Sequence, residues 1–95
     1  MIRYLSLLRF TEQGTKNLKN STVRAAAFRK AASKAGVTVE AQFWTTGAHD
    51  GVLIFTAKDE TTALRCLSAQ AAAGNVTTET LRAFDAKEFE AITRK

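Results

Sequence analysis

Three observations predict an α+β fold. This fold has a four-stranded antiparallel sheet with two helices on one face, and a short C-terminal helix. Strand-like and helix-like segments follow the order strand–helix–strand–strand–helix–strand. Both connections that contain a helix are long enough for right-handed crossovers. The first and third strand segments are apolar on both faces, as central strands are when both sides are covered. Together these features indicate a ferredoxin-like sandwich with strand order 4-1-3-2.

The first half of the chain supplies two strands and a helix. Residues 2–10 form the first predicted strand, with Leu5 and Leu7 on one face and Tyr4 and Leu8 on the other. A polar connection with one possible helical turn leads to a helix over residues 21–35, capped by Asn20 and Ser21. The inner positions of this helix recur every three or four residues: Ala25, Phe28, Ala32 and Ala35.

The second strand, residues 37–46, alternates more cleanly than the first. Its apolar face is expected to carry Val37, Val39, Ala41 and Phe43. The opposite face is expected to carry Thr38, Glu40, Gln42 and Trp44. An edge strand with a partly wet outer face has this pattern.

The second half repeats the plan with a third strand at residues 50–57, a helix at 59–73 and a fourth strand at 76–84. Asp59 is a predicted helix cap. The inner stripe of this helix is expected to consist of Ala63, Leu64, Leu67 and Ala71. Asp85 and Glu88 have the spacing of a capping box, and they begin a short helix that bears Phe89 and Ile92.

Length and composition indicate one domain, residues 1–95, that folds as a globule. Apolar residues make up 45% and charged residues 24% of the chain, close to the globular average. The single cysteine, Cys66, excludes an intramolecular disulfide. The first residues lack the basic start, apolar core and cleavage site of a signal peptide, and no apolar run reaches membrane-spanning length. We therefore expect a soluble, cytoplasmic protein with no membrane partner.

The charge is positive and unevenly distributed. The net charge is +5 overall, but residues 1–34 carry eight basic residues and one acidic residue, a net charge of +7. A surface for nucleic acid or for another anion is one interpretation. Aromatic residues are not interleaved with these bases, as a single-strand binder requires, so nucleic acid is not the expected partner.

Self-association is expected from the distribution of apolar residues. Two helices cover only one face of a sheet, whereas the central strands are apolar on both faces. An exposed apolar patch of this kind marks an interaction surface, and packing two sheets face to face would remove it. We therefore predict a homodimer or higher homo-oligomer of the dimeric α+β barrel type. The terminal helix is a second possible cover, for its own sheet or for the sheet of the partner.

The predicted hairpin at residues 43–55 holds the first group of candidate site residues. Histidine is the side chain best suited to proton transfer near neutral pH, which makes His49 the candidate catalytic acid or base. Asp50 is a candidate ligand residue, or a turn residue that binds local backbone. Trp44 is a candidate wall of a ligand pocket, or an interface anchor. We expect the side chains of His49 and Asp50 to point to opposite sides, because adjacent strand residues do so.

Tyr4, Ser6 and Arg82 form a second candidate group. Tyr4 and Ser6 share a face of the first strand, and Arg82 lies on the neighbouring fourth strand. Such a cluster could bind a carboxylate or phosphate through the guanidinium fork, or it could be an internal hydrogen-bonded group. One histidine and one cysteine do not form a metal site of recognisable spacing, and no phosphate-binding or dinucleotide motif is present. We therefore predict neither a metal nor a cofactor.

Three segments, Tyr4–Thr11, Phe43–Val52 and Asn75–Phe84, resemble the GYD-domain proteins, a family of small bacterial proteins without an established activity. The glycine and aspartate of the family signature correspond to Gly47 and Asp50, and His49 stands where the family usually has tyrosine. The resemblance covers nearly the whole chain. It implies the ferredoxin-like fold, and the departure at His49 weakens any role for a phenolic hydroxyl there.

Two more distant resemblances leave the function open. The Gly47-x-x-Asp50 pattern is similar to the effector-binding domain of leucine-responsive-type regulators, which implies a binding or sensing module that dimerises through its sheet. Dimeric α+β barrel monooxygenases and isomerases share the expected architecture. Three hypotheses follow: a homo-oligomeric small-molecule-binding domain with its site near the sheet interface, a cofactor-free enzyme with His49 as proton carrier, and a purely structural assembly subunit.

Overall fold

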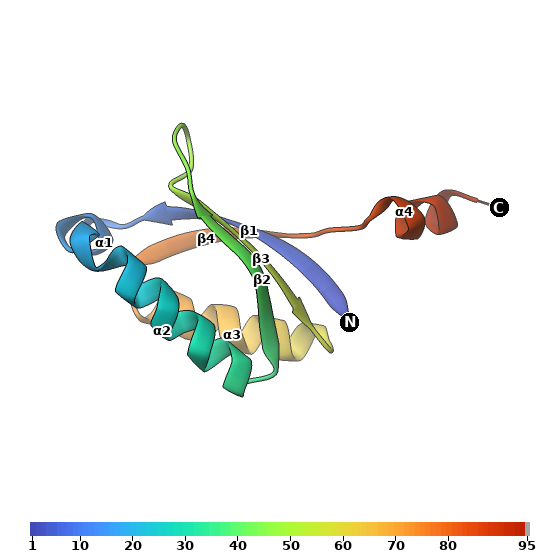
Figure 1. Cartoon of the computed structure of the whole chain (residues 1–95), viewed down its shortest axis with the longest axis horizontal. Helices are drawn as coiled ribbons and strands as arrows, with labels where there is room; N and C mark the ends of the chain where they lie inside the picture. The colour runs from blue at the N-terminus through green and yellow to red at the C-terminus, as the bar shows by residue number, and fades with distance from the viewer. Residues whose placement is uncertain (95) are drawn as a thin grey trace.

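The computed structural model describes residues 1–94 and contains a two-layer α+β domain with a projecting C-terminal helix (Figure 1). The elements in chain order are β1 (Ile2–Phe10), α1 (Glu12–Lys16), the 3₁₀ turn η1 (Leu18–Asn20), α2 (Ser21–Lys34), β2 (Val37–Trp44), β3 (Gly51–Ala57), α3 (Glu60–Ala72), β4 (Val76–Arg82) and α4 (Ala86–Thr93). None of the helices in the described part of the chain is long and apolar enough to cross a membrane.

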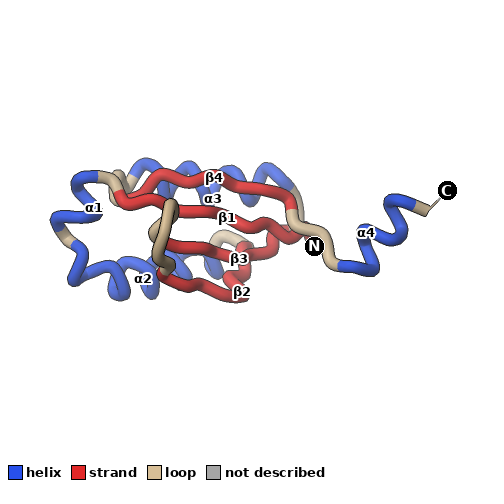
Figure 2. The backbone as a smooth tube through the Cα atoms, turned by 90° about the horizontal axis from the view of Figure 1, so that it is seen from above, coloured by secondary structure: helices blue, strands red, loops and turns tan. Residues whose placement is uncertain are grey.

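The sheet has the order β2-β3-β1-β4, and all its neighbouring strands are antiparallel. This order confirms the predicted topology, including the central position of the first and third strands. Helices α2 and α3 cover one face of the sheet, and the opposite face carries no helix (Figure 2). We call the uncovered side the open face.

The core lies between the sheet and the helices α2 and α3. Tyr4 and Leu8 of β1, together with Leu53 and Phe55 of β3, point toward the helices and are almost completely buried. Tyr4 and Phe55 are directly paired across the strands, and their rings stack with centroids 5.3 Å apart. Alternation along both central strands therefore gives one fully buried face, as predicted.

The open face carries the other apolar set of the central strands. Leu5 and Leu7 of β1 pair with Ile54 and Val52 of β3, and Leu81 of β4 lies opposite Leu5. The two β1 residues and the two β3 residues are only partly buried, and Leu81 is 44% exposed. The structure thus contains the uncovered apolar sheet face that the sequence indicates.

A β-bulge changes the predicted alternation of β2. The register shifts between Val39 and Ala41, so Glu40 is an extra residue in this strand. Val37 and Val39 face the helices as one set, but beyond the bulge Gln42 and Trp44 take that side, opposite Leu53 and Gly51. The remaining pair, Ala41 and Phe43, joins the open face opposite Ile54 and Val52. The expectation of one continuous apolar face from residue 37 to residue 43 is wrong, because an inserted residue inverts the phase of a strand.

The helices begin close to their predicted positions, but their caps and faces differ in part. The Asp59 carboxylate accepts a hydrogen bond from the backbone N–H of Thr62, as expected for a helix cap. Asn20 makes no side-chain capping bond, because the η1 turn leads directly into α2. The predicted inner position of Leu64 is wrong, since this side chain is 65% exposed. Thr62, Ala63 and Cys66 are instead the buried residues of α3.

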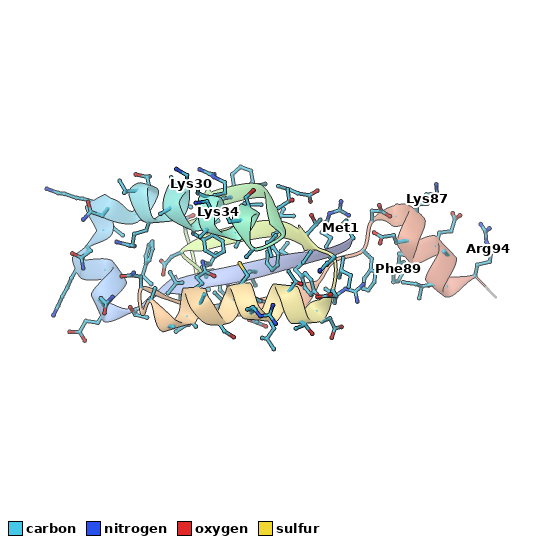
Figure 3. The ribbon with its side chains drawn as sticks, turned by 90° about the horizontal axis from the view of Figure 1, so that it is seen from below. Met1, Lys30, Lys34, Lys87, Phe89 and Arg94 are labelled. Atoms are coloured by element: carbon cyan, nitrogen blue, oxygen red, sulfur yellow. The ribbon has the colours of Figure 1, made fainter. Side chains whose placement is uncertain are left out.

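Helix α4 projects from one end of the domain (Figures 1 and 3), and its Glu88 lies 3.8 Å from Arg3 of β1. Asp85 and Glu88 form the predicted capping box, each side chain accepting a hydrogen bond from the backbone N–H of the other residue. Phe89 and Ile92 are 58% and 60% exposed. Helix α4 therefore has an apolar side that lacks a cover in the described chain. A helix of eight residues is only marginally stable without such packing.

Candidate functional site

The loop between β2 and β3 spans residues 45–50, which is longer than a tight hairpin turn. Asp50 fixes this loop to the end of β1: its backbone N–H donates to the carbonyl of Leu8 at 2.8 Å, and its Oδ2 accepts from the backbone N–H of Phe10 at 2.8 Å. Gly47 has φ +96°, in the left-handed region that glycine adopts without strain. Asp50 therefore binds backbone, as in the turn-residue interpretation, although the backbone belongs to β1 rather than to the loop.

His49 lies on the other side of the same loop, over the open face. It lines a small hollow of about 130 Å³ at the end of β1 and β4. The other residues that line the hollow are Leu7, Arg9, Thr77, Thr78 and Glu79. Asp50 does not contribute to this hollow, so the structure separates His49 from Asp50 as predicted. A histidine, an arginine and a glutamate around one hollow could hold a small polar molecule.

Trp44 lies on the helix side of the sheet, at the N-terminal end of α2. Its indole Nε1 donates a hydrogen bond to Ser21 Oγ at 2.9 Å, and the residue remains 48% exposed. The bulge at Glu40 places it there, because in a strand that alternated regularly through Glu40, Trp44 would lie on the face opposite to Val37 and Val39. Trp44 therefore joins the edge strand to α2 and does not line the hollow beside His49.

Tyr4 and Arg82 lie together at the far end of the sheet from the loop. They are cross-strand partners, and the Arg82 guanidinium lies 5.9 Å from the Tyr4 ring centroid and 4.9 Å from that of Phe84. Cation–π contacts of this kind are favourable by about 0.5–1 kcal/mol at exposed sites. The Tyr4 hydroxyl is buried without a hydrogen-bond partner in the described residues. The predicted cluster thus forms in part, but as a stack of aromatic rings with the guanidinium.

Ser6 belongs to the core and not to an accessible site. It is 0% exposed, and its hydroxyl is 3.0 Å from Thr80 Oγ1, the hydroxyl of its cross-strand partner. The six predicted ligand residues consequently fall into three places: Trp44 beside α2, His49 and Asp50 in the loop, and the other three along the β1–β4 pair on the helix side of the sheet. The structure does not bring them into one site.

A groove of about 500 Å³ lies between α2 and α3, and the sequence did not predict it. Phe10, Phe28 and Val76 contribute apolar side chains to it, and Arg24, Arg65 and Gln70 contribute polar ones. Alanines of both helices line the remainder: Ala25, Ala27, Ala31, Ala32, Ala35, Ala69 and Ala73. The signal in the sequence was the alanine content of both helices, because methyl groups are too short to fill the space between them.

No group of three or more possible metal-ligating side chains occurs in residues 1–94. Cys66 is buried in the wall of the groove, and burial raises the pKa of its thiol. A buried thiol with a raised pKa is a weak nucleophile and a poor metal ligand.

These features define the class of protein: it is a ferredoxin-like α+β domain whose apolar sheet face is not covered by a helix of the described chain. Residues 4–93 match the model of the GYD domain, and the chain therefore belongs to the GYD family. Its structure is similar to the crystal structure of TTHA0845 from Thermus thermophilus, with 25% sequence identity and a TM-score of 0.58. That match covers 90% of this chain and 96% of the other. No protein of curated function matches the chain.

Proposed function

We propose that this chain is a cytoplasmic, homodimeric binding module that packs two copies sheet to sheet and holds a small organic ligand at the edge of that interface. The uncovered apolar face carries the proposal. Leu5, Leu7, Val52 and Ile54 lie at its centre, with Phe43 and Leu81 at its margins 58% and 44% exposed. A contiguous apolar surface of this kind is unfavourable in water and marks an interaction site.

A second copy of the chain is the occupant that the charges favour. The open face carries two basic residues, Arg3 and Arg9, and two acidic residues, Glu40 and Glu79, so its charges balance. Arg3 already pairs with Glu40, with 2.9 Å between Nε and Oε1. A neutral face with both signs at its rim can meet an identical face across a two-fold axis without net repulsion. A nucleic acid would instead need a basic surface.

The ligand site proposed for the dimer is the hollow beside His49. It opens on the side where the second sheet would pack, and Arg9 supplies a cation for a carboxylate or similar anion. His49 adds an imidazole that can donate or accept a hydrogen bond. At about 130 Å³ in the single chain, the hollow is small, and packing of the second copy would deepen and enclose it.

The test of the dimer is the mass of the chain in solution, measured by light scattering after size exclusion. Twice the chain mass of 10.4 kDa is expected for the wild type, and the Ile54→Glu variant should give the single-chain mass. Leu64→Glu is the matched control, because Leu64 is 65% exposed on α3, away from the open face. A wild type that stays at 10.4 kDa at about 100 μM would refute the dimer.

The ligand is tested by thermal shift against a panel of small organic acids. At least one acid should raise the melting temperature of the wild type, and His49→Ala should abolish that rise. Thr46→Ala is the control, because Thr46 lies exposed in the same loop and does not line the hollow. No response from any acid, or an undiminished response in His49→Ala, would contradict the proposed ligand site.

A further inference from the structure

The groove between α2 and α3 lies on the helix side of the sheet, away from the proposed dimer interface. Figure 3 views the molecule from this side, with β1 visible between the two helices. Ligand pockets in proteins have volumes of about 300–1,000 Å³ and are mostly apolar with a few polar groups. The groove, at about 500 Å³, has the size and the lining of such a pocket. We propose that it binds an apolar carboxylate of small-molecule size, such as a medium-chain fatty acid.

The shape of the groove suits a linear apolar chain. It follows α2 from Ser21 to Ala35, a path of about 21 Å at 1.5 Å per helical residue. Alanine side chains form most of its length, while Phe28 and Val76 are partly buried against the core. An alkyl chain placed here would remove its own surface and that of the alanines from water, which is favourable by about 25 cal/mol per Å².

Arg24 is the expected partner of the carboxylate. Its Nη1 donates to the carbonyl of Asn17 at 2.7 Å, and its Nη2 lies 3.4 Å from the carbonyl of Gly14. These contacts hold the guanidinium at one end of the groove and leave other N–H donors of its five free. No acidic side chain pairs with Arg24 within residues 1–94. A fixed cation without an acidic partner favours binding of an anion.

A further polar group at the Arg24 end, Gln70, strengthens the preference for a polar head. Helices α2 and α3 run in opposite directions (Figure 1), so Gln70, late in α3, lies toward the Arg24 end, and Arg65, early in α3, lies toward the other. The Gln70 Oε1 is buried and has no hydrogen-bond donor in the described chain. An unpaired buried acceptor is costly, by about 1–3 kcal/mol. A ligand that donates a hydrogen bond near its head, such as a hydroxy acid, would pair this oxygen.

The exposed α4 of a second copy is the alternative occupant of the groove. Its charges make it a weaker ligand than a free carboxylate. Glu88 accepts from the Asp85 backbone and lies 3.8 Å from Arg3, and Glu90 pairs with Arg94 at 2.7 Å. Its acidic groups are therefore already partnered and would not neutralise Arg24. A free carboxylate carries no such partners.

The binding experiment uses decanoate as the probe and decanol as its neutral analogue. Trp44 is the only tryptophan, and it is hydrogen-bonded to Ser21 at the edge of the groove, so its fluorescence should report occupancy. Decanoate should bind about tenfold more tightly than decanol, and Arg24→Gln should remove this preference. Arg29→Gln is the matched charge control, because Arg29 lies exposed on α2 outside the groove. Equal binding of decanoate and decanol to the wild type would overturn the proposal.

Two alanine-to-phenylalanine substitutions in α2 distinguish the groove from other possible binding sites. Ala31→Phe should block decanoate binding, whereas Ala26→Phe should not, because Ala31 lines the groove and Ala26 lies on another side of the same helix. Ile54→Glu should leave the affinity within about twofold, so that loss of the dimer and loss of the groove site are distinguishable. Unchanged binding in Ala31→Phe would refute the site. Binding tightened tenfold in Phe89→Asp would show that α4 occupies the groove, which also refutes the proposal.

Discussion

Replacing Asp50 with alanine tests whether this loop aspartate is a structural residue. The Asp50 Oδ2 accepts a charge-assisted hydrogen bond of 2.8 Å from the half-buried backbone N–H of Phe10. Hydrogen bonds to charged groups contribute about 1.5–3 kcal/mol, and removing the acceptor leaves the donor without a partner. Asp50→Ala should therefore lower the free energy of unfolding by about 2 kcal/mol. In a domain of this size the corresponding fall in melting temperature is about 10 °C.

The assay is chemical and thermal unfolding followed by far-ultraviolet circular dichroism, at one protein concentration, since association would otherwise shift the midpoint. Asp50→Asn keeps an acceptor oxygen and should lose less than half as much stability. Thr46→Ala, a change at an exposed position of the same loop, should stay within about 0.5 kcal/mol of the wild type. If Asp50→Ala unfolds like the wild type, the contact with Phe10 does not stabilise the fold, and Asp50 returns to the set of candidate ligand residues.

Three further predictions follow from local contacts. Gly14→Ala should destabilise the domain by more than about 1 kcal/mol in urea unfolding, because its added Cβ would collide with the carbonyl oxygen of Asn75; a neutral effect would contradict this packing. The hydrogen bonds of Asp59 at the start of α3 lower its pKa, so the stability they contribute is present above the ordinary pKa of an aspartate and is lost as pH falls through the lowered value. Asp59→Asn should accordingly show a shallower loss of stability in acid titrations, and parallel titration curves would argue against this cap. Cys66, with its pKa raised by burial, should react with a thiol reagent at pH 8 far more slowly in the folded chain than in urea; equal rates would show that the thiol is accessible.

The topology was predictable because it depends on features that repeat along the chain. Apolar residues on both faces of β1 and β3 placed these strands at the centre, and the order β2-β3-β1-β4 confirms it. The helix caps at Asp59 and Asp85 were predictable from the sequence, because a cap needs only a suitable side chain at a fixed spacing from the start of the helix. These signals are local or periodic, so a single sequence contains them.

The site was less predictable because its geometry depends on one inserted residue and on space between helices. Nothing in the composition of β2 marks Glu40 as a bulge, yet the bulge decides the sides taken by Phe43 and Trp44. The groove depends on how far α2 and α3 stand apart, which their sequences do not specify. Ser6 looked like an accessible polar residue, but the hydroxyl of Thr80 pairs with it inside the core.

The bulge in β2 makes the faces of this edge strand depend on how one residue pairs. Deleting Glu40 would place Val39 and Ala41 opposite consecutive residues of β3, so the ladder would be regular and residues 41–44 would keep their sides. If Glu40 instead took a regular place in the ladder, Phe43 would turn toward α2, and the indole of Trp44 would leave Ser21 for the surface where a second copy is proposed to pack. A one-residue slip in pairing, with no change of sequence, would thus exchange the aromatic residue that faces a partner for the one that joins the edge strand to its helix.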